Sequence, residues 1–117
     1  MEFEYKKQES EIKRKEQSSL LLENYPQKCP IVLEKDPSCK LLKLTKKRYL
    51  LDKKSTVNQF MELIRRKTTL QEGEALFLHV KGRYSISGET TIEQIYKSYK
   101  DKDGFLYISY TNELIFG

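Results

Sequence analysis

Residues 46–67 read KKRYLLDKKSTVNQFMELIRRK and predict a short strand followed by a helix. The apolar run Tyr49–Leu51 has lysine and arginine on both sides, so at the edge of a sheet it would form a docking surface with a cationic rim. The helix, expected over 57–67, begins at a Thr-x-x-Gln capping box formed by Thr56 and Gln59. Its apolar residues follow the spacing of one buried helical face: Val57, Phe60, Met61 and Ile64.

Basic charge is concentrated around this strand and helix. Residues 40–67 carry ten lysines and arginines against two acidic residues, a net charge of +8, whereas the whole chain nets +5 and the remainder therefore −3. A local basic surface indicates nucleic acid, an anionic membrane or an acidic protein as the partner. The plain alternative is a solvated face with no partner.

Composition indicates one folded domain. The 117 residues are 38% hydrophobic and 33% charged, and the hydrophobic residues fall in periodic blocks, which argues against disorder. No apolar run approaches the ~20 residues that span a bilayer, and the N-terminus lacks the apolar core of a signal peptide. We therefore expect a protein of the cytoplasm or nucleus.

The cysteine and histidine residues indicate neither a metal site nor an enzyme. Cys29 lies in an apolar run and is expected in the core as a reduced thiol, whereas Cys39 is expected to be exposed in a loop. The one histidine, His79, lies in a strand pattern and is expected to be partly buried. Without a CxxC motif or a nucleophile–histidine–acid set, we expect no metal, no cofactor and no catalytic residues.

The remaining elements complete an α+β pattern. Helices are expected over 4–9, 11–24 and 91–99, the last after a second capping box at Thr90–Glu93. Strands are expected around 31–33, 47–52, 75–80 and 105–110. This order predicts a ubiquitin-like β-grasp fold, a four-stranded mixed sheet over a central helix, with two additional N-terminal helices. We divide the chain into a helical extension packed on the core, 1–26, and a ubiquitin-like domain, 27–117, with a mobile tail over 111–117.

Several motifs resemble those of a known family and occur in its order and spacing. They are Lys35-x-Pro37, Lys46-Lys47-Arg48-Tyr49-Leu50, Thr56-Val57-x-Gln59-Phe60-x-x-Leu63-Ile64-Arg65, Asp103-Gly104-Phe105-Leu106-Tyr107-Ile108-x-Tyr110 and Phe116-Gly117. On these residues the chain resembles, essentially end to end, the autophagy-related ubiquitin-like modifiers, which include the GABA-receptor-associated and microtubule-associated light-chain-like proteins.

The resemblance implies a covalent membrane tag attached through Gly117. In that family a ubiquitin-type activating enzyme uses ATP to activate the glycine, a conjugating enzyme carries it as a thioester, and phosphatidylethanolamine receives it as an amide. A cysteine protease processes precursors and removes the lipid. The residue type agrees, because glycine has no Cβ and its carboxylate can thread a narrow enzyme channel. The tagged protein would then lie on the autophagosome membrane.

The resemblance also implies a groove for short receptor peptides of the form Trp/Phe/Tyr-x-x-Leu/Ile/Val, which add as an extra strand along Lys47–Leu51. An aromatic pocket is implied at Gln17, Leu21, Pro30, Arg48, Leu50 and Phe105. An aliphatic pocket is implied at Tyr49, Leu51, Phe60, Leu63 and Ile64, although the last three also fit plain core positions. A basic rim of Lys46, Lys47, Arg48 and Arg65 would meet acidic or phosphorylated flanks.

Four features depart from the family pattern and bear on partner choice and helix placement. Asp52 stands where the family often has proline, and Gly104 where some members have an aromatic residue. The loop 84–89 lacks the usual prolines. Ile12 is the nearest apolar candidate for anchoring the N-terminal helices.

Other functions stay open at this stage. The chain could be a ubiquitin-like adaptor that is never conjugated, or a basic module that binds nucleic acid or the acidic tubulin tails of microtubules. Against specific nucleic-acid binding, the tyrosines fall at core-like spacings and the sequence has no Gly-rich or RNP-type motif.

Overall fold

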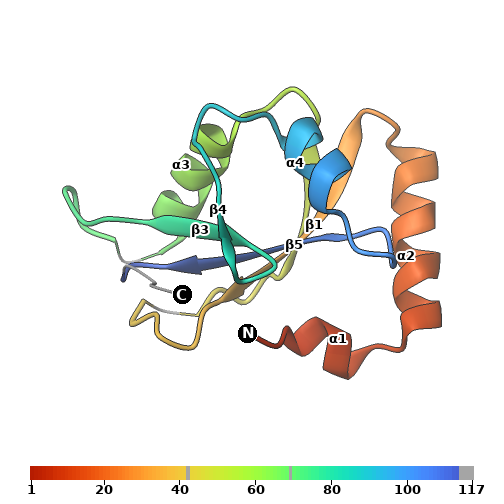
Figure 1. Cartoon of the computed structure of the whole chain (residues 1–117), viewed down its shortest axis with the longest axis horizontal. Coiled ribbons are helices and arrows are strands. Elements are labelled where there is room, and N and C mark those ends of the chain that lie inside the picture. Colours follow the sequence, from red (N-terminus) through yellow and green to blue (C-terminus); the bar gives the residue numbers. More distant parts are fainter. Residues whose placement is uncertain (42, 69, 114–117) are drawn as a thin grey trace.

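The computed structural model describes residues 1–41, 43–68 and 70–113 and shows an α+β fold (Figure 1). The helices are α1 Glu4–Gln8, α2 Glu11–Asn24, α3 Val57–Lys67 and α4 Ile92–Tyr99. The strands are β1 Lys28–Lys35, β2 Arg48–Asp52, β3 Phe77–Val80, β4 Tyr84–Ser85 and β5 Leu106–Thr111. In Figure 1, α3 and α4 lie above the sheet, α1 lies below it and α2 stands along its right side.

The strands form one mixed sheet in the order β2-β1-β5-β3-β4. β1 and β5 run parallel at its centre, and the other neighbouring pairs are antiparallel. The predicted β-grasp fold is confirmed, with five strands among the described residues instead of the four expected. The additional strand, β4, forms because the chain reverses at Lys81 and Gly82, which have φ of 57° and 70°, the left-handed geometry that hairpin turns favour. A strand of two residues has no periodicity that a sequence could display.

Side chains that alternate along the strands build two cores. On β1, Ile31 and Leu33 join the larger core with α3 and α4, whereas Val32 joins a smaller core under the N-terminal helices. The smaller core consists of Phe3, Tyr5, Val32, Phe105 and Tyr107. Two edge-to-face ring pairs hold it together, Phe3 with Tyr107 at 5.1 Å and Tyr5 with Phe105 at 5.4 Å between centroids.

Capping boxes start both helices of the larger core. Thr56 and Gln59 exchange the two expected hydrogen bonds at the start of α3, so that box is confirmed. The box of α4 pairs Thr91 with Gln94, one residue later than expected. The difference follows from Ile92, which is fully buried and enters the core as the first helical residue, so the cap must directly precede it.

Two loop and tail residues are more buried than the sequence suggested. Cys39, expected to be exposed, is buried in the larger core because the turn after β1 folds inward, where Cys39 N donates to Asp36 O at 2.9 Å. Thr111, the first residue of the expected mobile tail, ends β5, pairs with Phe77 and is fully buried. Residues 114–117 of that tail lie outside the described residues.

The buried residues of α2 are polar, while Leu21 and Leu22 pack half-buried on the two cores. The expected anchor Ile12 is 72% exposed and Leu20 is 59% exposed, so the anchor prediction is wrong. The buried residues of α2 are Arg14 and Ser18, which meet the turn before β5. Ser18 Oγ donates to Asp103 O at 2.5 Å, and Arg14 Nε lies 3.1 Å from Asp103 Oδ2. These contacts place α2, and hydrophobic periodicity could not reveal them.

The carboxylate of Asp103, a residue that is 1% exposed, also accepts hydrogen bonds from β5 and the residue before it. Its Oδ1 accepts from Phe105 N at 2.9 Å and its Oδ2 from the Tyr107 hydroxyl at 2.5 Å. Arg14 Nε has no partner of hydrogen-bond geometry within the described residues, so its contact with Asp103 is electrostatic. Burial and the Asp103 carboxylate raise the pKa of Tyr107, which therefore keeps its donor proton.

Replacing Gly104 by alanine is expected to lower the free energy of unfolding by about 2–3 kcal/mol in urea denaturation. Gly104 has a φ of +90°, and an added Cβ would lie 2.3 Å from Ser18 Oγ and 2.9 Å from Ser18 Cβ, so rotation of the hydroxyl alone cannot relieve the contact and Ser18 must shift. Gly73→Ala is the matched control, because Gly73 has a φ of +88° but nothing within 4 Å of the added Cβ. Equal losses in the two variants would contradict a close contact between α2 and Gly104.

Candidate functional site

Of the two edge strands of the sheet, β2 and the two-residue β4, the longer is β2. Its residues pair only with β1 in the described part of the chain, from Lys28 opposite Asp52 to Val32 opposite Arg48. The opposite side of β2 therefore presents main-chain donors and acceptors that a further strand could use. The predicted edge position of this strand is confirmed.

A groove of about 730 Å³ runs beside β2 and is closed on its other side by α1 and α2. β2 and the residues just before it supply one wall, and the two N-terminal helices supply the other. The lining residues are Tyr5, Gln8, Glu9, Gln17, Leu21, Thr45, Lys46, Lys47, Arg48, Tyr49 and Leu50.

The residues proposed for an aromatic pocket divide between the wall of this groove and the layer beneath it. Four of the six line the groove: Gln17, Leu21, Arg48 and Leu50. Pro30 is buried on β1 directly opposite Leu50. Phe105 is fully buried in the smaller core, against which Leu21 packs. Pro30 and Phe105 thus support the groove from within.

A polar contact bridges α1, α2 and β2 within the groove. The Tyr5 hydroxyl donates to Gln17 Oε1, and Arg48 Nη1 donates to the same oxygen at 3.2 Å. Arg48 also lies over the Tyr5 ring, 5.9 Å from its centroid. Burial raises the pKa of Tyr5, so its hydroxyl stays protonated and remains a donor. An apolar side chain entering the groove would meet Leu21 and Leu50 beside this polar contact.

The residues proposed for an aliphatic pocket are mostly core. Phe60 and Ile64 are 2% and 1% exposed, and the Tyr49 ring packs edge-to-face on Phe60 at 5.8 Å. Leu51 and Leu63 are half-buried against the same core and reach the surface. Leu51 and Leu63 are thus half-buried at the surface of the larger core, to which the other three residues belong.

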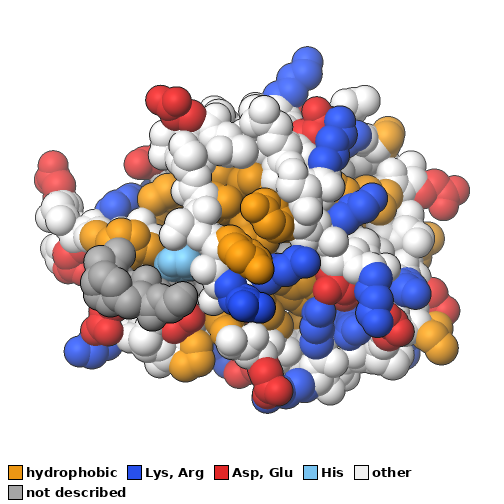
Figure 2. Space-filling view, in the orientation of Figure 1, with side chains coloured by type: hydrophobic (Ala, Val, Ile, Leu, Met, Phe, Trp, Pro, Cys, Tyr) orange, Lys and Arg blue, Asp and Glu red, His pale blue; other side chains and the backbone are white. Residues whose placement is uncertain are grey.

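The proposed basic rim is only partly at the groove. Lys46 and Lys47 line it, and Lys46 Nζ lies 4.8 Å above the Tyr49 ring. Arg65 instead lines a separate depression at the end of α3 with Glu62. Figure 2 shows lysine and arginine side chains interleaved with acidic ones on the side where α1 and α2 lie, so the surface there is mixed in charge.

Comparisons with known proteins agree with this fold. Residues 13–117 match the family described as "Autophagy protein Atg8 ubiquitin like". The chain belongs to the Atg8 family. Autophagy-related protein 8e of Arabidopsis thaliana is 36% identical over 105 residues, which cover 90% of this chain and 85% of that relative. The crystal structure of Trypanosoma brucei ATG8 superposes with a TM-score of 0.91 over the full length of both chains at 29% identity.

Sequence reasoning missed four groove residues of this Atg8-family chain: Thr45, just before β2, and Tyr5, Gln8 and Glu9. The last three lie at α1, whose placement depends on Glu34 of β1. The Glu34 carboxylate accepts from Glu4 N at 2.7 Å and Tyr5 N at 2.9 Å. No local pattern near α1 points to Glu34, so no signal in the sequence could have found these residues.

The predicted conjugation residue, Gly117, lies outside the described residues. In the described part of the chain, no helix is long and apolar enough to cross a bilayer, and no group of three metal-binding side chains occurs.

Proposed function

We propose that this Atg8-family chain is a ubiquitin-like modifier conjugated through Gly117 to phosphatidylethanolamine. Its enzymes would be a ubiquitin-type activating enzyme, a conjugating enzyme, and a cysteine protease that processes the chain and removes the lipid. Membership of the family supports this part of the proposal. The protein would move from the cytoplasm to the autophagosome membrane when it is lipidated.

On that membrane the chain would recruit autophagy receptors that carry Trp/Phe/Tyr-x-x-Leu/Ile/Val peptides. The observation that carries this part is the unpaired edge of β2 beside a groove walled by α1 and α2. A peptide strand would bond to the main chain of β2, which gives affinity independent of sequence. Its aromatic residue would lie between Leu21 and Leu50, and its aliphatic residue against Leu51 and Leu63, which gives selectivity.

Replacing Leu50 by glutamine is expected to weaken binding of a Trp-x-x-Leu peptide at least about tenfold, measured by fluorescence anisotropy. Leu50 is an apolar wall of the groove, and its amide replacement would leave polar atoms against the peptide's ring. Leu20→Gln is the matched control, because Leu20 lies on α2 with its side chain exposed and does not line the groove. Equal affinity of both variants would count against the groove as the binding site.

A second peptide tests strand addition itself. N-methylation of alternate peptide amides removes the donors that would face β2 and leaves the side chains unchanged. We expect this peptide to bind much more weakly than its counterpart methylated at the other set of alternate amides, because only one set points to the sheet edge. Equal binding of the two methylated peptides would contradict main-chain pairing with β2.

A further inference from the structure

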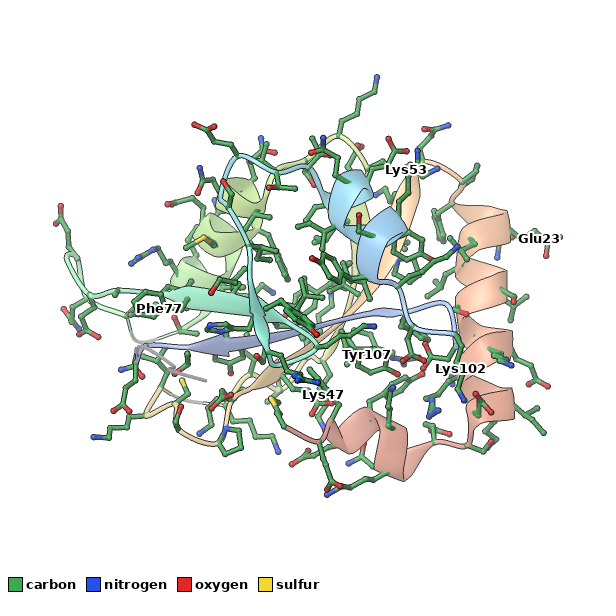
Figure 3. All side chains as sticks on the ribbon, viewed as in Figure 1. Glu23, Lys47, Lys53, Phe77, Lys102 and Tyr107 are labelled. Atoms are coloured by element: carbon green, nitrogen blue, oxygen red, sulfur yellow. The ribbon has the colours of Figure 1, made fainter. Side chains whose placement is uncertain are left out.

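The side chain of Glu4 joins α1 to the segment that precedes β2. Glu4 Oε2 lies 2.6 Å from Lys47 Nζ and 3.1 Å from Lys43 Nζ. Figure 3 shows Lys47 on the side of the sheet where α1 begins. Hydrogen bonds from Lys47 and Lys43 lower the pKa of Glu4 to about 2, so its carboxylate is charged at neutral pH.

The backbone of Glu4 is held independently of these lysines. The carboxylate of Glu34, which is buried on β1, accepts from the main-chain N–H groups of Glu4 and Tyr5 at the start of α1. A negative charge at this end of a helix is also electrostatically favourable. Glu34 therefore fixes the start of α1, and from this position the Glu4 side chain reaches both lysines.

Lys47 belongs to two surfaces at once. It lines the docking groove, and it also lines a neighbouring depression that contains Glu4. The other cations of the groove have partners of a different kind: Lys46 lies over the Tyr49 ring and Arg48 donates to Gln17. Among the groove cations in the described part of the chain, Lys47 is thus the one paired with a carboxylate.

We propose that Glu4 determines peptide selectivity by competing, within the molecule, for the lysines that an acidic or phosphorylated peptide flank would contact. The proposal rests on the proposed docking function. A flanking acid at Lys47 would meet a cation whose charge Glu4 already offsets, so it would gain less than it would from an unpaired lysine. The unaltered chain should therefore prefer acidic flanks only weakly.

The test compares two peptides that share a Trp-x-x-Leu core and carry either neutral flanks or aspartates on both sides. Glu4→Gln is expected to raise the affinity ratio of acidic to neutral peptide about three- to tenfold in dilute buffer. The gain should shrink at 0.5 M salt, where screening shortens the range of the charges to about 4 Å. Glu11→Gln is the matched control and should leave the ratio unchanged, because Glu11 pairs with Lys102 and lines neither the groove nor the depression that contains Glu4.

A variant that lacks both lysines distinguishes competition for these lysines from a general loosening of α1. In a chain that carries Lys43→Gln and Lys47→Gln, adding Glu4→Gln should no longer change the ratio, because the contested cations are gone. A gain of the same size there would overturn the proposal, as would an unchanged ratio in folded Glu4→Gln protein. If the neutral peptide fails to bind the unaltered chain, the docking function itself fails and this inference falls with it.

Discussion

A chain that lacks Gly117 is expected to form no adduct with phosphatidylethanolamine. The reaction would contain the activating enzyme, the conjugating enzyme, ATP and phosphatidylethanolamine liposomes, and mass spectrometry would detect the adduct. In the proposed route the glycine carboxylate becomes a thioester, and the lipid amine displaces the enzyme thiol to form the amide. Gly117→Ala should react far more slowly, because its Cβ must pass through a channel that suits glycine.

One added C-terminal residue provides the control for this experiment. A chain extended by a single residue after Gly117 should form no adduct until the cysteine protease removes that residue, and cleavage should restore the reaction in full. This result would show that the free carboxylate of Gly117 is the reacting group. An adduct of normal yield from the chain without Gly117 would contradict the conjugation proposal.

Replacing Asp103 by alanine is expected to lower the free energy of unfolding by about 3–5 kcal/mol. The substitution would remove the carboxylate that lies 3.1 Å from the buried Arg14 guanidinium and would remove the acceptor for Phe105 N and the Tyr107 hydroxyl. Losses of this size are a large fraction of the stability of a small domain. Urea denaturation followed by circular dichroism would measure the change.

Two further variants show how much of that loss of unfolding free energy comes from the buried charge. Glu11→Gln removes the ion pair between Glu11 of α2 and Lys102 in the turn before β5, at 3.2 Å, and should hardly change the unfolding midpoint because solvent screens these exposed side chains. Asp103→Asn keeps an acceptor oxygen but no charge, so its loss should be intermediate. If Asp103→Ala lowers the free energy of unfolding no more than Glu11→Gln does, the buried contact does not hold α2 in place.

The central part of the fold could be predicted because its signals are local. The capping box of Thr56 and Gln59 and the face of α3 that begins at Val57 depend on residues within one or two helical turns. The alternation of Leu106, Ile108 and Tyr110 likewise assigned one face of β5 to the larger core. Four of the six residues proposed for the aromatic pocket line the groove, and Phe105 lies in the layer beneath it.

The N-terminal helices could not be predicted in the same way. Ile12 was the nearest apolar candidate for an anchor, yet α2 buries Arg14 and Ser18 because the turn at Asp103 and Gly104 offers charge, a carbonyl oxygen and space. A Cβ at position 104 would lie 2.3 Å from Ser18 Oγ. The polar packing of α2 therefore depends on glycine at this position.

The sequence by itself determined the α+β pattern, the strand–helix unit of residues 46–67 and the residues that face the core, because backbone hydrogen bonds and side-chain periodicity act over a few residues. Only the tertiary structure decided what lies opposite β2. The far wall of the groove depends on Glu34 holding Tyr5, 29 residues away, and on Asp103 holding Ser18, 85 residues away. Such contacts join polar groups that are satisfied only after the chain has folded, so they leave no periodic signal in the sequence.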